Sequence, residues 1–249
     1  MNEYKRFILE RKADISALGE NNTIKEMTRD WINIVNKKKY SYHFDWLGRP
    51  IIQYPQDIIA MQEIIWQVKP DLIIETGIAH GGSLIFSSSM LELNAACGGP
   101  KDAEVLGIDI EIRPHNRKAI EEHPMCHRIT MIEGDSTSDD VIAQVHIRAK
   151  NRKRILVCLD SNHTHEHVLS ELEAYAHLTS VGSYCVVFDT IIEDLPEDSF
   201  PDRPWGKGNN PKTAVWEYLK KHPEFEIDKS IENKLLITVA PDGYLKRVE

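Results

Sequence analysis

Long apolar runs are missing from this sequence. Of its 249 residues 41% are hydrophobic, yet no run approaches the roughly 18 residues that a membrane span needs. The first residues, MNEYKRFILERKAD, are charged and lack the apolar region of a signal peptide. We therefore expect a cytoplasmic protein without a membrane span. The hydrophobic content suffices for a single core, in one large domain or a domain with a short appendage.

Cysteine and positive charge are also in short supply. None of the four cysteines forms a CxxC pair, so a zinc site is not expected. Cys158 and Cys185 lie within apolar runs and should be buried, reduced thiols. The 30 Lys and Arg residues are outnumbered by 39 Asp and Glu, for a net charge of −9. This balance argues against a nucleic-acid partner, because phosphates need a basic surface.

What the sequence does contain is a regular alternation of short apolar runs and helical stretches. The pattern predicts strands at Leu72–Glu75, Val105–Asp109, Arg128–Ile132, Ile155–Asp160, Tyr184–Asp189, Phe225–Ile227 and Lys234–Val239. It predicts helices at Gly82–Leu93, Arg117–Glu122, Asp139–Ala149, Glu166–Leu178 and Lys212–Lys221. Short, almost wholly apolar strands between helices indicate an α/β fold with a mostly parallel sheet covered on both faces.

Two further helices are predicted before the first of these strands. Thr23 and Glu26 have the spacing of a capping box, and Ile24, Met27, Trp31 and Ile34 follow at helical spacing. The second helix should start near Pro55 and end before Pro70.

Acidic residues stand at or just after the ends of five predicted strands. They are Glu75, Asp109, Asp135, Asp160 and Asp189. Ligands of doubly wound sheets bind at the carboxyl ends of the strands. One acid there is unremarkable as a helix cap. Five acids on one rim would cost stability if they were left unpaired, so the set favours a polar ligand or a cation at this edge.

A glycine-rich turn follows the first of these strands, but it lacks the GxGxxG dinucleotide fingerprint. Its spacing is Glu75-x-Gly77-x-x-x-Gly81-Gly82-Ser83. The glycines allow a tight turn close to a ligand. A carboxylate two residues before the first glycine suits a cationic group better than a phosphate, and a nucleoside with a positive sulfonium or amino group fits. We therefore predict S-adenosylmethionine as the ligand, with Asp109 at its ribose and Asp135 toward its adenine.

Long stretches of the chain resemble the cephalosporin hydroxylase family, which includes rhamnosyl O-methyltransferases. The resemblance rests on FDWLGRPIIQYPQDIIAMQEIIWQVKPDLIIETGIAHGGSL, GIDIEIRP, EGDS, LDSNHTHEHVLSELEAYAHLTSVGSYCVVFDT and KGNNPKTAVWEYL. It covers about Phe44 to Val239. It implies a Rossmann-like class I methyltransferase sheet of seven strands with the last one antiparallel. The expected organisation is a helical N-terminal extension, residues 1–50, and a methyltransferase domain, residues 51–249.

The resemblance also implies roles for particular residues. The residues that would bind S-adenosylmethionine are Glu75, Gly77, Gly81, Gly82, Ser83, Asp109, Asp135 and Ser136. Asp160 and Asp189 would bind Mg²⁺ or another divalent cation. The family often has an adjacent acid pair where this chain has Phe188 and Asp189. The third protein ligand is therefore open between Glu193, Asp194, a histidine of the next motif and water.

The stretch LDSNHTHEH contains H-x-x-E-H, a zinc-peptidase pattern made by His163, Glu166 and His167. Its position after a strand-ending acid in a βαβ series is wrong for a peptidase. Mg²⁺ prefers oxygen ligands, so the histidines are better bases than ligands, and histidine is largely neutral near pH 7. We predict that Asp160 and His163 are catalytic, with His163 as the general base. The alternative is that His163 or Asn162 caps the helix.

Residues 190–212 contain four prolines and two glycines among many charges. A loop of this length in a compact domain is usually a functional lid or a disordered insertion. We predict a lid over the substrate, in which Trp205 stacks on a sugar face and Asn209 contributes a contact. His165 and His167 are further candidates for substrate binding. The segment Trp46–Arg49 could fold over the cofactor or form an apolar packing corner.

The predicted function is metal-dependent O-methylation of a hydroxyl on a sugar, polysaccharide or natural product, with homo-oligomerisation expected. Two alternatives stay open. A Rossmann-type oxidoreductase acting on a nucleotide-sugar is disfavoured by the missing GxGxxG motif. A non-catalytic cofactor-binding partner protein is left open by Phe188, which replaces one acid of the metal site.

Overall fold

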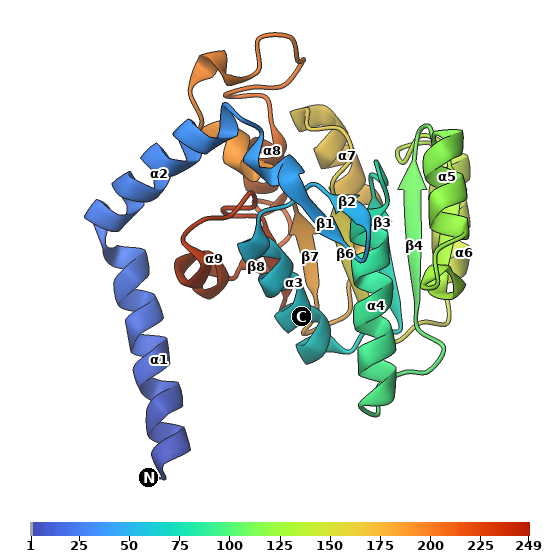
Figure 1. Ribbon diagram of the computed structural model, residues 1–249, viewed down its shortest axis with the longest axis horizontal. Coiled ribbons are helices and arrows are strands. Elements are labelled where there is room, and N and C mark those ends of the chain that lie inside the picture. Colours follow the sequence, from blue (N-terminus) through green and yellow to red (C-terminus); the bar gives the residue numbers. More distant parts are fainter. Residues whose placement is uncertain (1) are drawn as a thin grey trace.

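A computed structural model describes residues 2–249 and has a seven-stranded sheet at its centre (Figure 1). The strands are β3 (Leu72–Thr76), β4 (Glu104–Asp109), β5 (Ile129–Glu133), β6 (Ile155–Leu159), β7 (Tyr184–Val187), β8 (Phe225–Ile227) and β9 (Tyr244–Arg247). A separate hairpin is formed by β1 (Phe44–Trp46) and β2 (Arg49–Ile51). The helices are α1 (Glu3–Glu20), α2 (Asn22–Asn36), α3 (Pro55–Val68), α4 (Gly82–Ala96), α5 (Pro114–Glu121), α6 (Asp139–Ala149), α7 (His165–Tyr175), α8 (Pro211–Tyr218) and α9 (Lys229–Leu235).

The strand order is β5-β4-β3-β6-β7-β9-β8. β3 to β7 pair in parallel, whereas β9 runs antiparallel to both of its neighbours. The sheet order reverses between β3 and β6, and such a switch point is where doubly wound sheets bind ligands. The predicted fold class, a seven-stranded and mostly parallel sheet with its last strand antiparallel, is confirmed.

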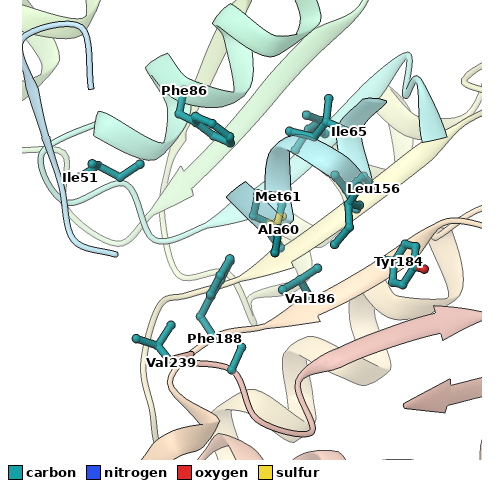
Figure 2. Close-up of a cluster of buried hydrophobic side chains, with 14 of the residues drawn as sticks. Ile51, Ala60, Met61, Ile65, Phe86, Leu156, Tyr184, Val186, Phe188 and Val239 are labelled. Carbon is teal, nitrogen blue, oxygen red and sulfur yellow. The ribbon is translucent and has the colours of Figure 1, made fainter. Parts of the chain in front are cut away.

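Successive side chains of the central strands enter two different cores, as the two-residue period of a strand requires. Ile73 packs with the cluster that contains residues of α3, α4 and α5, while Leu72 and Ile74 pack with residues of α6, α7 and α8. Figure 2 shows the first cluster, in which Met61 of α3 lies over Val186 and Phe188. Both faces of the sheet are therefore covered.

The N-terminal helices lie beside the sheet domain. The C-terminal end of α1 packs against α9, where Gly19 lies next to Asn233, and its N-terminal end extends away (Figure 1). The side chain of Asn21 caps α2 by accepting a hydrogen bond from the amide of Ile24 at 3.1 Å, so the predicted capping box at Thr23 is wrong. Met27 and Ile34 of the predicted apolar face are 66% and 67% exposed. Among the described residues, no helix combines the length and the hydropathy that a membrane crossing demands.

The predicted strand Lys234–Val239 is also wrong. α9 continues to Leu235, and the segment after it binds the buried Asp57 of α3. The hydroxyl of Thr238 and the amide of Val239 both donate to the Asp57 carboxylate. An apolar run of this length is equally typical of a strand and of a buried connection. The antiparallel strand is the later segment β9.

Candidate active site

The strand-end acids gather on one edge of the sheet. Thr76 of β3 is in register with Ile108 of β4 and with Leu159 of β6. The loops that follow these strands therefore leave the sheet at the same level. Val187 of β7 is in register with Leu159, so the loop after β7 leaves the sheet at this level as well. This edge lies at the carboxyl ends of the parallel strands, beside the switch point.

The turn between β3 and α4 needs glycine because protein backbone crosses close to it. Gly77 and Gly81 have φ angles of 89° and 81°. A Cβ at Gly77 would overlap the carbonyl oxygen of Asp160, and one at Gly82 would overlap the carbonyl oxygen of Pro50. The predicted glycines therefore bring the turn directly against the loop that carries Asp160.

Asp109 braces this turn from the end of β4. Its Oδ2 accepts hydrogen bonds from the amides of Ile78, at 2.8 Å, and Ala79, at 3.2 Å. Its Oδ1 accepts from the amide of Glu111 at 3.2 Å. The carboxylate therefore fixes the glycine turn, and its contact with a ribose stays a prediction.

Asn116 also holds the turn, although no pattern in the sequence marks it. Its Nδ2 donates to the carbonyl oxygen of Ala79 at 2.8 Å, and its Oδ1 accepts from Arg49 Nη2 at 3.1 Å. Arg49 Nε donates to the carbonyl oxygen of His80 at 3.0 Å. Trp46, earlier in the same hairpin, packs edge-on against Phe86. The hairpin thus serves as a packing corner at Trp46 and as a support for the turn at Arg49.

Glu75 lies below the turn and is only 4% exposed. The hydroxyl of Ser83 donates a hydrogen bond to its carboxylate. Burial raises the pKa of Glu75 to about 7, although the bond from Ser83 opposes that shift. No other hydrogen bond to its side chain is formed within residues 2–249. A positive group placed beside Glu75 would favour its ionised form.

The loop after β5 presents one exposed acid and one buried hydroxyl. Asp135 accepts hydrogen bonds from the amide and the hydroxyl of Thr137, at 2.9 and 2.7 Å. These bonds lower the pKa of Asp135. Ser136 is 6% exposed and donates to Glu171 of α7 at 2.6 Å. Asp135 therefore faces outward, and its contact with an adenine stays a prediction, while Ser136 points into the protein.

Asp160, His163 and Asp189 form a compact cluster after β6 and β7. One ligand atom from each lies within 4.8 Å of the others. Nε2 of His163 is 3.3 Å from Oδ2 of Asp189. Gln53 donates from Nε2 to Oδ2 of Asp160 at 3.3 Å. The two acids predicted to bind a metal are thus brought together with the predicted base.

The charges in this cluster suit a cation. Burial raises the pKa of Asp160 well above its ordinary value, and the charges of Asp189 and Glu75 raise it further. No lysine or arginine within residues 2–249 forms an ion pair with Asp160 or Asp189. A divalent cation would relieve this repulsion, and carboxylate oxygens are the ligands that Mg²⁺ prefers.

Neither of the two acids left open as a third ligand lies in this cluster. Glu193 accepts a hydrogen bond from the amide of Gly208 at 2.7 Å, and Asp194 pairs with Lys212 at 2.5 Å. Phe188, which stands where the family often has an acid, is 6% exposed and packs in the core (Figure 2). His163 is the candidate side chain that lies within 4.8 Å of both aspartates, and water stays open as the third ligand.

The predicted lid, residues 190–212, contacts the cluster through Trp205. Its ring meets the ring of His163 edge-on, with centroids 4.9 Å apart and planes at 82°. The other predicted substrate contacts lie elsewhere. Asn209 Oδ1 accepts from the amide of His165 at 2.9 Å, and the His165 ring bonds Thr213 at 2.8 Å. These two residues therefore anchor the base of the loop.

His167 takes a third position, between the loops that follow β5 and β6. Its Nε2 lies 3.2 Å from Oγ of Ser136 and 3.1 Å from Oγ of Ser161. Glu171, fully buried beside it, is a residue that sequence reasoning missed. The one signal for it in the sequence is its position one helical turn after His167. The H-x-x-E-H pattern of the same stretch drew attention to the histidines instead.

A family model described as rhamnosyl O-methyltransferase/CmcI matches residues 38–248. A rhamnosyl O-methyltransferase of Mycobacterium tuberculosis is 31% identical over 194 residues, which cover 77% of this chain and 73% of that protein. The rhamnosyl O-methyltransferase of Mycobacterium leprae is 31% identical over 207 residues, covering 81% and 82%.

Solved structures of CmcI share the fold. The apo form aligns with a TM-score of 0.56 at 19% identity and covers 84% of this chain and 77% of its own. A form described as containing magnesium and S-adenosylmethionine aligns with a TM-score of 0.53 at 19% identity, covering 84% and 78%.

Proposed function

The chain belongs to the rhamnosyl O-methyltransferase/CmcI family of O-methyltransferases, and from this we propose its reaction. It transfers a methyl group from S-adenosylmethionine to a hydroxyl of a sugar, polysaccharide or natural product, and it uses a divalent cation. One observation carries the proposal. The backbone of Asp160 lies so close to the glycine turn that Gly77 has no room for a side chain, and the side chain of Asp160 forms a cluster with His163 and Asp189.

The turn and its neighbours would hold the cofactor. The residues proposed for this are Glu75, Gly77, Gly81, Gly82, Ser83, Asp109, Asp135 and Ser136. S-adenosylmethionine carries a sulfonium and an ammonium group, which would favour ionisation of the buried Glu75. The magnesium- and S-adenosylmethionine-bound form of CmcI supports the same pair of cofactors here.

Asp160 and Asp189 would hold the cation, which supplies positive charge that makes a nearby hydroxyl more acidic. Gln53 orients Asp160 through its 3.3 Å hydrogen bond. His163 Nε2 would take the proton of the acceptor hydroxyl as a general base. Asp189, 3.3 Å from that nitrogen, would then stabilise the protonated ring. Holding acceptor and methyl donor side by side supplies the proximity that direct displacement needs.

Trp205 is the lid residue best placed to contact the acceptor. Its ring lies against His163, and an aromatic face suits the apolar face of a sugar. His165 and Asn209 would act on the acceptor only by holding the loop. Residues 1–50 would form an extension to the domain of residues 51–249. Exposed Phe7, Met27 and Ile34, at 55%, 66% and 67%, favour its use in a homo-oligomer.

The test is calorimetric titration of the purified protein with S-adenosylmethionine and with NAD, each with Mg²⁺ and after chelation. We expect micromolar binding of S-adenosylmethionine and none of NAD. Acceptors with free rhamnosyl hydroxyls are then assayed for Mg²⁺-dependent formation of S-adenosylhomocysteine. Binding of NAD alone would overturn the proposal. Retained cofactor binding without turnover on any hydroxylated acceptor would favour the non-catalytic partner role.

A further inference from the structure

A buried carboxylate joins two loops of the site. Glu171 of α7 is fully buried, and its Oε1 accepts hydrogen bonds from the hydroxyls of Ser136, at 2.6 Å, and Ser161, at 2.7 Å. Ser136 follows β5 in the loop proposed for adenine. Ser161 directly follows Asp160 in the loop proposed for the cation. One oxygen atom therefore ties the cofactor loop to the metal loop.

His167 completes this cluster. Its Nε2 is within 3.2 Å of both serine oxygens and 3.4 Å from Oε1 of Glu171. Both serine hydroxyls donate to Glu171, so a proton on Nε2 would complete the hydrogen bonds between this nitrogen and the serine oxygens. The hydroxyl of Tyr175 donates to the carbonyl oxygen of Ser136. Ser136 is thus held through its side chain and its backbone.

Packing a helix against a sheet does not require such a cluster of polar groups. Oε2 of Glu171 is buried and has no hydrogen-bond partner within residues 2–249. A buried carboxylate with an unbonded oxygen lowers stability, and apolar residues of similar volume often replace such groups without loss. What the carboxylate does provide is a fixed distance between the two serine hydroxyls.

We propose that Glu171 is a positioning residue that holds the cofactor loop and the metal loop in one arrangement, so that S-adenosylmethionine and the divalent cation bind in a mutually dependent way. This inference rests on the proposed function. Linkage requires the dependence to be reciprocal. If Mg²⁺ changes the affinity for S-adenosylmethionine by some factor, the cofactor changes the affinity for Mg²⁺ by the same factor.

The experiment compares the wild type with Glu171→Gln, Ser136→Ala and Ser161→Ala, with Glu173→Gln as the control on the same helix. Glu173 is exposed, whereas Glu171 is not. Calorimetry gives the dissociation constant of S-adenosylmethionine with Mg²⁺ and after chelation, and a Mg²⁺ titration of activity gives the half-maximal concentration. In the wild type, Mg²⁺ should change the cofactor affinity at least fivefold, as typical coupling energies imply.

Glu171→Gln should weaken cofactor binding and Mg²⁺ activation, each by roughly tenfold, the size expected for a hydrogen bond to a charged group. The coupling factor should fall toward one. Ser136→Ala should act mainly on the cofactor constant, and Ser161→Ala mainly on the Mg²⁺ constant. Glu173→Gln should resemble the wild type. If Glu171→Gln does not fold, the two serine variants decide.

Three results would overturn the inference. The first is a wild type that binds both ligands independently. The second is a Glu171→Gln protein with a lower unfolding temperature but unchanged constants, because the role would then be only structural. The third is a wild type that binds neither ligand, which would remove the proposed function as well and so is distinguishable from the other two.

Discussion

The carbonyl oxygen of Asp160 occupies the space that a side chain on Gly77 would need. The two residues lie in different loops, one after β6 and one after β3, and this approach brings the acid cluster to the glycine turn. Backbone of one loop therefore sets the position of the other. The glycine spacing suggested room for a ligand. At Gly77, however, the space beside the backbone is filled by the carbonyl group of Asp160.

Gly77→Ala should strongly destabilise the fold. Its φ of 89° is unfavourable for alanine by about 1–2 kcal/mol, and the overlap with Asp160 adds roughly 1–3 kcal/mol of overpacking. Gly98→Ala is the matched control, since Gly98 has a φ of 84° but open space around it. Only the backbone term of about 1–2 kcal/mol should appear there. If urea unfolding gave the same loss in free energy of unfolding for both variants, the close approach of Asp160 to Gly77 would be unimportant.

Cofactor binding should release a proton from Glu75 below neutral pH. Burial raises the pKa of Glu75 from 4.5 to about 7. In the free protein the carboxyl is thus protonated at pH 6, and a cationic ligand would ionise it. The apparent affinity for S-adenosylmethionine should increase about tenfold between pH 6 and 8. Calorimetry at pH 6 in buffers of different ionisation enthalpy measures the proton directly.

The same shift predicts how stability without ligand depends on pH. A carboxyl with a raised folded pKa contributes stability that is complete below its unfolded value of 4.5 and is lost as pH rises through about 7. The loss amounts to about 3 kcal/mol. Glu75→Gln should remove both this slope and the proton release. Proton release that persists in Glu75→Gln would assign it to another group.

The sequence was informative where local pattern and tertiary structure agree. The alternation of apolar strands and helices predicted the sheet. The acids at the strand ends predicted the site, because parallel strands end at one edge. Contacts between distant segments left no such pattern. Asn116 meets Ala79 from 37 residues away, and Glu171 meets Ser136 from 35 residues away. The run Lys234–Val239 is apolar because Val239 packs in the core, not because it pairs in the sheet.

Asp160→Asn should abolish stabilisation by Mg²⁺ while leaving the metal-free protein at least as stable as the wild type at pH 8. The raised pKa of Asp160 means that its charge is unfavourable without a cation. A cation at 100 times its dissociation constant should stabilise the wild type by about 2.7 kcal/mol. Thermal unfolding with Mg²⁺ and with chelator measures this. Exposed Asp102 supplies the control Asp102→Asn, and an equal Mg²⁺ effect in Asp160→Asn would place the cation elsewhere.

Trp205→Ala should act on the acceptor and not on the cofactor. The ring lies edge-on against His163, and a lost aromatic contact is worth about 0.5–1.5 kcal/mol. The KM for the acceptor should rise up to roughly tenfold, with the dissociation constant for S-adenosylmethionine unchanged. Trp66→Ala, at a site 48% exposed on α3, is the control. A change in cofactor affinity alone would place Trp205 over the cofactor.

His163 can be assigned as a base or as a metal ligand, because the two roles predict different kinetics. Its Nε2 lies 3.3 Å from Asp189, close enough for either. For a general base, His163→Ala should lower kcat by about 10²- to 10⁴-fold and leave the half-maximal Mg²⁺ concentration unchanged. Activity should recover as pH rises, since hydroxide then replaces the base. A strong rise in the Mg²⁺ requirement, with kcat restored at saturating metal, would instead identify His163 as the third ligand.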